Sequence, residues 1–166
     1  MLRKITLETF DQLSCIIKQL SVEEYSRTLQ VLGDSSIGQH VRHILEFYVC
    51  LSNSIDTGYV NYDARKRNDT LSTNPDAALA LIEYLTSLFY RNNILNREIK
   101  NVIEYHGEQF SSNSSMEREF IYLIEHNIHH FAIINIAIKE NFGHVATPSG
   151  FGVAYSTIQH KEKIAH

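Results

Sequence analysis

The segment 114–141, SSMEREFIYLIEHNIHHFAIINIAIKEN, constrains the fold of this chain more than any other stretch. Its apolar residues recur mostly at spacings of one to four, which is the pattern of a helix with a wide buried face. Ser114 followed by Glu117 fits a capping box at the start, and Asn141 and Gly143 favour an end nearby. We therefore predict one long helix over residues 114–141.

Three histidines lie in this predicted helix. His126 and His130 are four residues apart, so their side chains point the same way about one turn apart. His129 is about 60° from His126 around the helix axis and is expected to flank the pair. Leu123 shares the stripe of the pair, which places the two rings toward the core. Two interpretations are open: a pair of metal ligands, or ordinary half-buried histidines.

The composition favours a single helix-rich domain over residues 1–166. Hydrophobic residues make up 43% of the chain, and only two prolines and seven glycines occur, so a compact core of sizeable extent is expected. The formal net charge is −4, and the 15 lysines and arginines form no long basic block. This argues against a nucleic-acid-binding surface, which needs a concentrated positive face.

The sequence also predicts the cellular compartment of the protein. The N-terminal stretch MLRKITLETF lacks the apolar region of a signal peptide, and the apolar run near Phe131 is interrupted by Asn135 and too short for a membrane span. Cys15 and Cys50 both fall beside apolar residues in predicted helices, which favours buried free thiols over a disulfide. We therefore expect a cytoplasmic protein that makes no membrane contact.

Helical periodicity predicts three further long helices. They are expected over residues 6–20, 37–55 and 75–105. Asn74 and Pro75 support the start of the third, as an N-cap followed by a proline at the first helical position. With the helix over 114–141 and one long crossover loop, these elements predict an all-α fold, a four-helix bundle.

A second pair of histidines, His40 and His43, lies in the predicted helix 37–55. Their stripe adjoins the main apolar stripe, where a histidine is usually packed or at the solvent edge. His43 becomes a candidate ligand because a bundle could bring it against His126 and His130. Three imidazoles leave a divalent ion at least one open position, which is typical of catalytic rather than structural sites. Zinc and nickel both suit imidazole ligands.

Two of the segments outside the predicted helices carry expectations of their own. Residues 56–74 form a long polar connection, which is uncommon in a compact domain and often functional. It is interpreted either as a solvated loop or as a rim where Arg65 and Arg67 contact an anionic substrate group. After Gly143, Pro148 and two glycines are expected to prevent a regular helix, giving an irregular C-terminal tail that lies back across the bundle. Its histidines are expected to be solvated: His144, His160 and His166.

Several stretches resemble a known family. SIGQHVRHILEF and EREFIYLIEHNIHHFAIINI are similar to the DinB/YfiT-like superfamily of metalloenzymes, and YDARKR and FGVAYST are similar to one branch of it. The resemblance covers essentially the whole chain. It implies a four-helix bundle in which three histidines surround a divalent ion. These match His43, the histidine followed by Ile-Leu-Glu, together with His126 and His130.

The resemblance also implies a class of activity. Some members are metal-dependent thiol transferases that attach bacillithiol, mycothiol or a related thiol to electrophiles, and some isomerise small acids with thiol help. The family name refers to induction by DNA damage and implies no DNA contact. This chain has no tryptophan, unlike many relatives, and no motif that identifies its thiol.

The predicted function is therefore a metal-dependent thiol S-transferase or hydrolase-like enzyme acting on a small electrophile. Two alternatives remain: a non-catalytic metal-binding, stress-related domain, and a bundle whose histidines merely pack. The tyrosine- and isoleucine-rich faces predict a homodimer.

Overall fold

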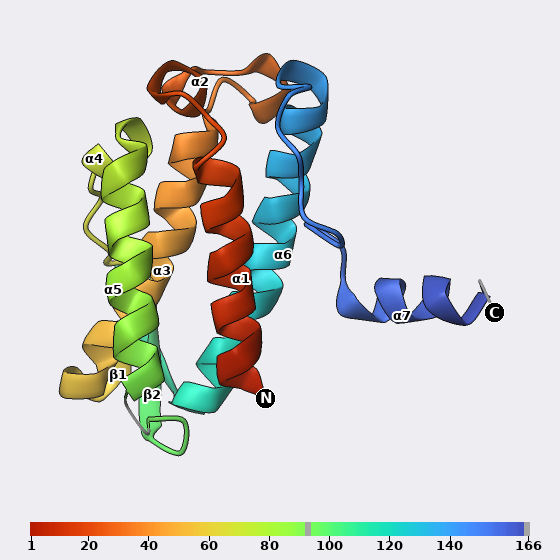
Figure 1. The fold of residues 1–166 in the computed structure, drawn as a ribbon. Helices are drawn as coiled ribbons and strands as arrows, with labels where there is room; N and C mark the ends of the chain where they lie inside the picture. The colour runs from red at the N-terminus through yellow and green to blue at the C-terminus, as the bar shows by residue number, and fades with distance from the viewer. Residues whose placement is uncertain (92–93, 165–166) are drawn as a thin grey trace.

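The computed structural model describes residues 1–91 and 94–164, and the chain is mostly helical (Figure 1). Four long helices lie side by side: α1 (Leu2–Ile17), α3 (Ile37–Thr57), α5 (Pro75–Arg91) and α6 (Met116–Asn141). The shorter elements are α2 (Val22–Ser26), the 3-10 helix η1 (Gln30–Leu32), β1 (Tyr59–Val60), α4 (Thr70–Thr73), β2 (Glu98–Tyr105), β3 (Glu108–Ser115) and α7 (Tyr155–Ile164).

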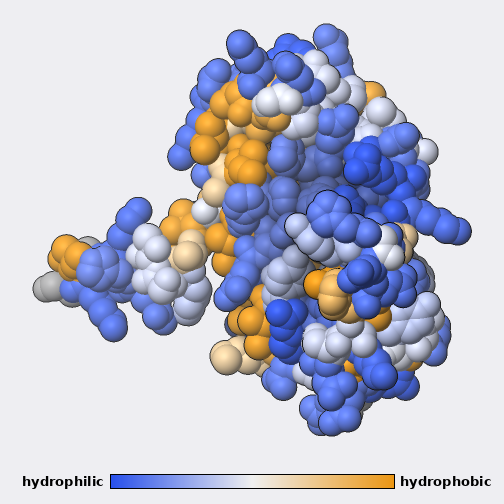
Figure 2. Space-filling model, turned by 180° about the vertical axis from the view of Figure 1, so that it is seen from behind, coloured by the Kyte–Doolittle hydropathy of each residue, from blue (hydrophilic) through white to orange (hydrophobic). Residues whose placement is uncertain are grey.

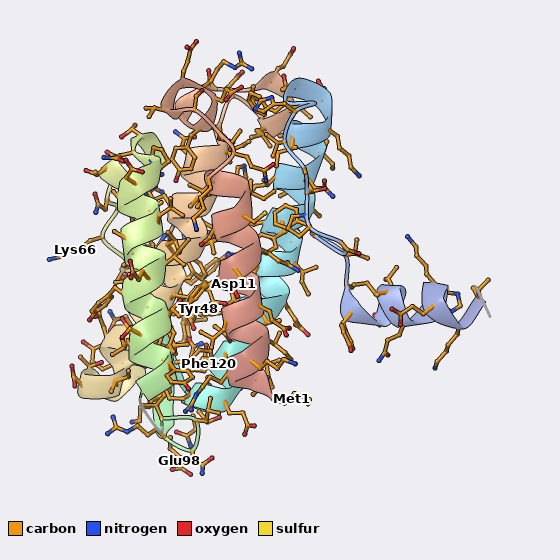
Figure 3. All side chains as sticks on the ribbon, in the orientation of Figure 1. Met1, Asp11, Tyr48, Lys66, Glu98 and Phe120 are labelled. Atoms are coloured by element: carbon orange, nitrogen blue, oxygen red, sulfur yellow. The ribbon has the colours of Figure 1, made fainter. Side chains whose placement is uncertain are left out.

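The core lies between the four long helices. Tyr48 of α3 is fully buried, and its ring centroid lies 4.7 Å from that of Phe10 in α1 and 6.1 Å from that of Phe89 in α5. Phe89 in turn meets Phe120 of α6 edge-on at 5.0 Å. Figure 3 shows Tyr48 and Phe120 among the helices. Aromatic pairs in these geometries add to the burial of their rings, so one cluster ties all four helices together.

The long helices that carry the histidines begin and end close to the predicted positions. Ser36 caps α3, which runs two residues beyond the predicted end at residue 55. The helix predicted over 114–141 ends at residue 141, but its predicted capping box is wrong. Ser115 caps it by accepting the backbone N–H of Arg118, because the hydroxyl of Ser114 donates instead to Glu119 at 2.5 Å.

The all-α prediction is wrong for residues 98–115, which form an antiparallel hairpin of β2 and β3. The helix predicted over 75–105 ends as α5 at residue 91; residues 92–93, which that prediction also covered, lie outside the described part. Tyr105 pairs with Glu108, which leaves a two-residue turn with φ of 51° at His106 and 82° at Gly107. Positive φ at both positions suits the twist of a two-residue hairpin. β1 pairs in parallel with β2, which gives a sheet ordered β1-β2-β3.

The connection over residues 56–74 is partly structured and is held against α3. Gly58, with φ of 75°, ends α3 in the left-handed conformation that glycine adopts most easily. Further along, the backbone N–H of Asn68 donates to the buried carboxylate of Glu46 at 2.7 Å. Arg42 of α3 forms an ion pair with Asp69 at 2.5 Å. These contacts fix the segment that lies beside the histidines.

The C-terminal tail agrees with the prediction only over its first part. Phe151 stacks on Phe131 of α6 with ring centroids 4.4 Å apart, and Asn135 donates to the Phe151 carbonyl at 3.1 Å. Beyond residue 154 the tail forms the regular helix α7, so the predicted absence of helix is wrong there. None of the residues of α7 is buried, and this helix extends away from the rest of the structure (Figure 1). Figure 2 shows that the rear surface of the molecule is mostly hydrophilic, with separate apolar patches.

The two cysteines are free, as predicted. Cys50 is partly buried, but the predicted burial of Cys15 is wrong because α1 turns the neighbouring Ile16 and Ile17 inward and leaves this thiol exposed. Among the described residues, none of the helices combines the length and apolarity that crossing a membrane requires.

A close approach at Gly38 positions the first turn of α3. A β-carbon there would clash with the carbonyl oxygen of Ser72 and lie 2.7 Å from the ring of Tyr25. We expect Gly38→Ala to lower the free energy of unfolding by about 1–3 kcal/mol in urea denaturation. Gly143→Ala is the control, because nothing lies within 4 Å of a β-carbon there, and its effect should stay below about 0.5 kcal/mol. Equal losses in the two variants would contradict this account.

Candidate metal centre

Three histidines from two helices meet between α3 and α6. His43 comes from α3, and His126 and His130 come from successive turns of α6. The Nε2 atoms of His43 and His126 lie 3.0 Å apart, and one nitrogen from each of the three rings falls within 4.8 Å of the others. The ring centroids are 4.5–5.0 Å apart. The structure therefore brings together the three residues that the sequence singled out.

The local sequence explains how these rings are aimed. The four-residue spacing in α6 places two imidazoles on one stripe. On α3, a capping box fixes the helix start: the Ser36 hydroxyl accepts the Gln39 backbone N–H at 3.1 Å, and the Gln39 side chain accepts the Ser36 N–H at 3.2 Å. His43 follows within the second turn, so the cap sets the direction in which its ring faces α6.

Burial dominates the electrostatics of the three rings. It lowers the pKa of His43 and His126 to about 4 and that of His130 to about 3. Repulsion from neighbouring histidines adds to each shift, and the Arg65 guanidinium adds to those of His43 and His126. The rings are therefore neutral at pH 7, which is the form of imidazole that binds metal ions.

An aromatic stack covers one side of the cluster. Phe47 lies parallel to the ring of His126 at 4.6 Å, and Tyr62 lies parallel to Phe47 at 4.8 Å. The Tyr62 hydroxyl donates to the buried carboxylate of Glu119 at 2.8 Å, which holds the outer ring in place. This stack withdraws the histidines from water and is consistent with their low pKa values.

His40 is a member of the site that the sequence left unassigned. Its Nδ1 atom lies 3.1 Å from Nδ1 of His130, and its Nε2 atom lies 3.1 Å from the hydroxyl of Ser35. The donor in each contact depends on the tautomers. Contacts of this kind orient the ring of a ligating histidine. The available signal was weak: His40 precedes His43 by three residues and lies on a neighbouring stripe of the same helix.

The remaining histidines of α6 and the tail are not members of the cluster. His129 is exposed on the flank of α6, as expected, and its ring meets that of His130 edge-on at 5.2 Å. His144 is exposed, with Nε2 3.6 Å from a Glu24 oxygen, and His160 is exposed on α7, so their predicted solvation is confirmed. His166 lies outside the described residues.

The two arginines predicted to form an anion-binding rim differ in position. Arg65 is mostly buried: its Nε lies 3.4 Å from Glu46, one terminal nitrogen donates to the Tyr62 carbonyl at 3.1 Å, and the other lies 3.4 Å from Nδ1 of His43. Arg67 is exposed. Only Arg65 therefore lies beside the histidines, and it already pairs with a carboxylate.

The fold and this cluster define a mostly helical protein with a candidate three-histidine metal centre. The structure is similar to the crystal structure of a DinB-like protein, YjoA, from Bacillus subtilis. The TM-score is 0.52 at 21% sequence identity, and the match covers 90% of this chain and 96% of that one. The likeness confirms the resemblance to DinB-like proteins at the level of the fold.

Comparisons based on sequence alone support less about this chain than the comparison of structures does. No family model matches the chain. A curated protein named FK506-binding protein 5, from Rhizopus delemar, is 31% identical over 137 residues, covering 80% of this chain and 35% of that protein. The chain thus spans about a third of the length of this relative.

Proposed function

We propose that the chain binds a divalent metal ion through His43, His126 and His130 and uses it to act on a small molecule. The observation that carries the proposal is the meeting of three partly buried imidazoles from two helices. Binding through the facing Nε2 atoms of His43 and His126 would place a proton on Nδ1 of His43, so the Arg65 nitrogen beside it, which can only donate, would have to turn away. His130 would bind the metal ion through Nε2, because its Nδ1 atom contacts His40.

The donor set fits such an ion. The facing Nε2 atoms are 3.0 Å apart, close to the roughly 3.3 Å expected of two nitrogens on one tetrahedral zinc with Zn–N bonds of about 2.0–2.1 Å. Among the described residues, no carboxylate or thiol belongs to this group. Three protein ligands leave a coordination position for a substrate, and zinc and nickel are the ions that we expect.

The proposed reaction is transfer of a small thiol to an electrophile, or a hydrolysis-like reaction on a similar substrate. A bound divalent ion supplies thiolate or hydroxide at neutral pH. The chain's own side chains would prepare the site. Phe47 and Tyr62 keep water from one side, and Arg65 disfavours protonation of His43. The DinB-like fold supports this proposal.

A second candidate function is a non-catalytic metal-binding domain, and one observation favours it. Phe47 stacks on His126 at 4.6 Å, and the Nδ1 atoms of His40 and His130 lie 3.1 Å apart, so side chains of the chain itself occupy space around the cluster. A catalytic centre normally opens into a concave pocket that holds the substrate. This candidate predicts that a chelator lowers Tm, whereas no electrophile is turned over.

The two candidates separate in one assay. Protein purified without a His-tag or a nickel column is supplied with zinc or nickel and then tested for conjugation of bacillithiol to monobromobimane. Thiol transfer predicts metal-dependent turnover that His126→Ala abolishes and His129→Ala retains. Bound metal without turnover, on this and a wider panel of electrophiles and esters, would favour the non-catalytic domain. Absence of stoichiometric metal would end both.

The stability of the metal-free protein should fall in acid. Unfolded imidazoles bind a proton near pH 6.5, whereas burial holds the pKa of the folded rings at about 4 or about 3. Between pH 6.5 and 4 the unfolded state therefore binds more protons, and the free energy of unfolding decreases as pH falls through this window. Urea denaturation with chelator from pH 7.5 to 4.5 measures the slope. A His43→Gln, His126→Gln, His130→Gln triple variant should give a shallower slope, and an unchanged slope would contradict the assignment.

A further inference from the structure

A second candidate site adjoins the histidine cluster. A cavity of about 530 Å³ lies between α3, the segment over residues 59–68, α4 and α5. This volume is in the range of pockets that hold small ligands. Glu46 and Cys50 line it on α3, and Arg65 and Lys66 line it on the crossing segment. The three histidines are not part of its wall.

One part of the cavity is apolar. Val49 of α3, Leu71 of α4 and Leu81 of α5 contribute to its lining. Leu71 is buried, and the other two are partly buried. The partly buried thiol of Cys50 adds to this surface, and burial raises its pKa, so the thiol is uncharged at pH 7. An apolar ligand body of modest size would remove this surface from water.

The charged residues of the wall favour an anion. Arg65 and Lys66 carry two positive charges against the one negative charge of Glu46. That carboxylate accepts the Asn68 N–H at 2.7 Å, and it lies 3.4 Å from Nε of Arg65 and 3.8 Å from Nε of Arg42, so two arginines share its one charge. The wall therefore retains a net positive charge that its own acidic group does not cancel.

Both cations have capacity for a further partner. The guanidinium of Arg65 carries five N–H groups, and its contacts with Glu46, the Tyr62 carbonyl and His43 engage three of them. Lys66 is exposed, and Figure 3 shows it extending away from the body of the protein. A flexible lysine side chain at the rim can turn toward an anion in the cavity.

We propose that this cavity binds a small organic acid. The apolar body of the ligand packs against Val49, Leu71 and Leu81, and its carboxylate contacts Arg65 and Lys66. An arginine fork and a lysine ammonium both suit a carboxylate. The exposed Arg67 does not line the cavity. The proposal requires no bound metal, although one Arg65 nitrogen lies 3.4 Å from Nδ1 of His43.

The test uses phenylacetate and its neutral counterpart phenylacetamide as probes. Each is titrated into the full chain in a chloride buffer, and the methyl NMR signals of Val49, Leu71 and Leu81 are followed. Phenylacetate should give saturable shifts at these methyls. Phenylacetamide should bind at least about tenfold more weakly, because it lacks the charge that the two cations recognise.

Two neighbouring variants provide a matched comparison. Lys66→Ala should weaken phenylacetate binding roughly three- to fivefold, as for an exposed ion pair, and leave phenylacetamide unaffected. Arg67→Ala removes an equal charge one residue away and should leave both affinities unchanged. The proposal is overturned by absence of saturable shifts at the three methyls, by equal affinity for acid and amide, or by equal effects of the two variants.

Cys50 offers an independent readout. In a Cys15→Ser background, alkylation of the remaining thiol by N-ethylmaleimide should be slowed by phenylacetate and much less by phenylacetamide. The same protection is expected in a Cys15→Ser, His126→Ala variant. This protection by phenylacetate is therefore expected even if the chain binds no metal. Alkylation at an unchanged rate with saturating phenylacetate would contradict the proposed organic-acid site and would leave the metal proposal untouched.

Discussion

His126→Ala and His130→Ala are each expected to abolish stoichiometric metal binding, while His129→Ala leaves it unchanged. The first two residues supply rings to the cluster in which one nitrogen from each member lies within 4.8 Å of the others. The third lies in the same helix, next to His130, but is exposed and outside the group. It therefore controls for the loss of a histidine from α6.

The expected effect on affinity is large. Removing a partner that merely orients a ligand costs about 10–100-fold in metal affinity, so removing a ligand should cost at least about a hundredfold. Elemental analysis of untagged protein gives the metal content, and competition with a chelator gives the Kd. Because an ion that binds only the folded state stabilises it, chelation should lower Tm in the parent chain and in His129→Ala only. Unchanged metal content in both cluster variants would end the assignment.

The site was predictable because its signal is local in each helix. The four-residue spacing of His126 and His130 aims two rings together whatever surrounds the helix, and a bundle limits where His43 of another helix can lie. His40 could not be assigned in this way. Its contact with His130 depends on rotamers and on Ser35, which sequence spacing does not specify.

The hairpin was missed because two patterns compete in one stretch. Ile99, Val102 and Ile103 continue the helical period of α5, yet they are β-branched and favour a strand. The partner strand, EQFSSNSS, has no apolar alternation, and a His-Gly turn is a weaker hairpin signal than Asn-Gly. Residues 98–105 form a strand because they pair with β3, and the sequence of one strand by itself does not show that this pairing occurs.

The tail shows a related limit. Pro148 and the glycines that follow exclude helix only where they occur, and the helix-compatible sequence beyond residue 154 is free of both residues. Burial likewise depends on the exact rotation of a helix. Cys15 precedes the apolar residues Ile16 and Ile17 along the chain but falls on the exposed face of α1.

Glu119 is the position outside the histidine cluster where we expect the largest loss of stability. Its carboxylate has no exposure to solvent and gathers four donors. One oxygen accepts the Tyr62 hydroxyl at 2.8 Å. The other accepts Asn101 at 3.2 Å, Ser114 at 2.5 Å and Arg118 at 3.0 Å. These donors come from the crossing segment, β2, β3 and α6, so one carboxylate joins the sheet and the crossover to α6.

Glu119→Ala should lower the free energy of unfolding by about 3–5 kcal/mol, because it leaves several donors without their acceptor and opens a cavity. Glu117→Ala removes an exposed carboxylate from the same helical turn and should cost less than about 1 kcal/mol. Urea denaturation at pH 7 compares the two variants. Since Tyr62 stacks on Phe47 and Phe47 on His126, Glu119→Ala should also weaken metal binding, by less than His126→Ala does. A loss of stability no greater than that of Glu117→Ala would show that the four donors find water or other acceptors, and that this carboxylate does not hold the sheet to α6.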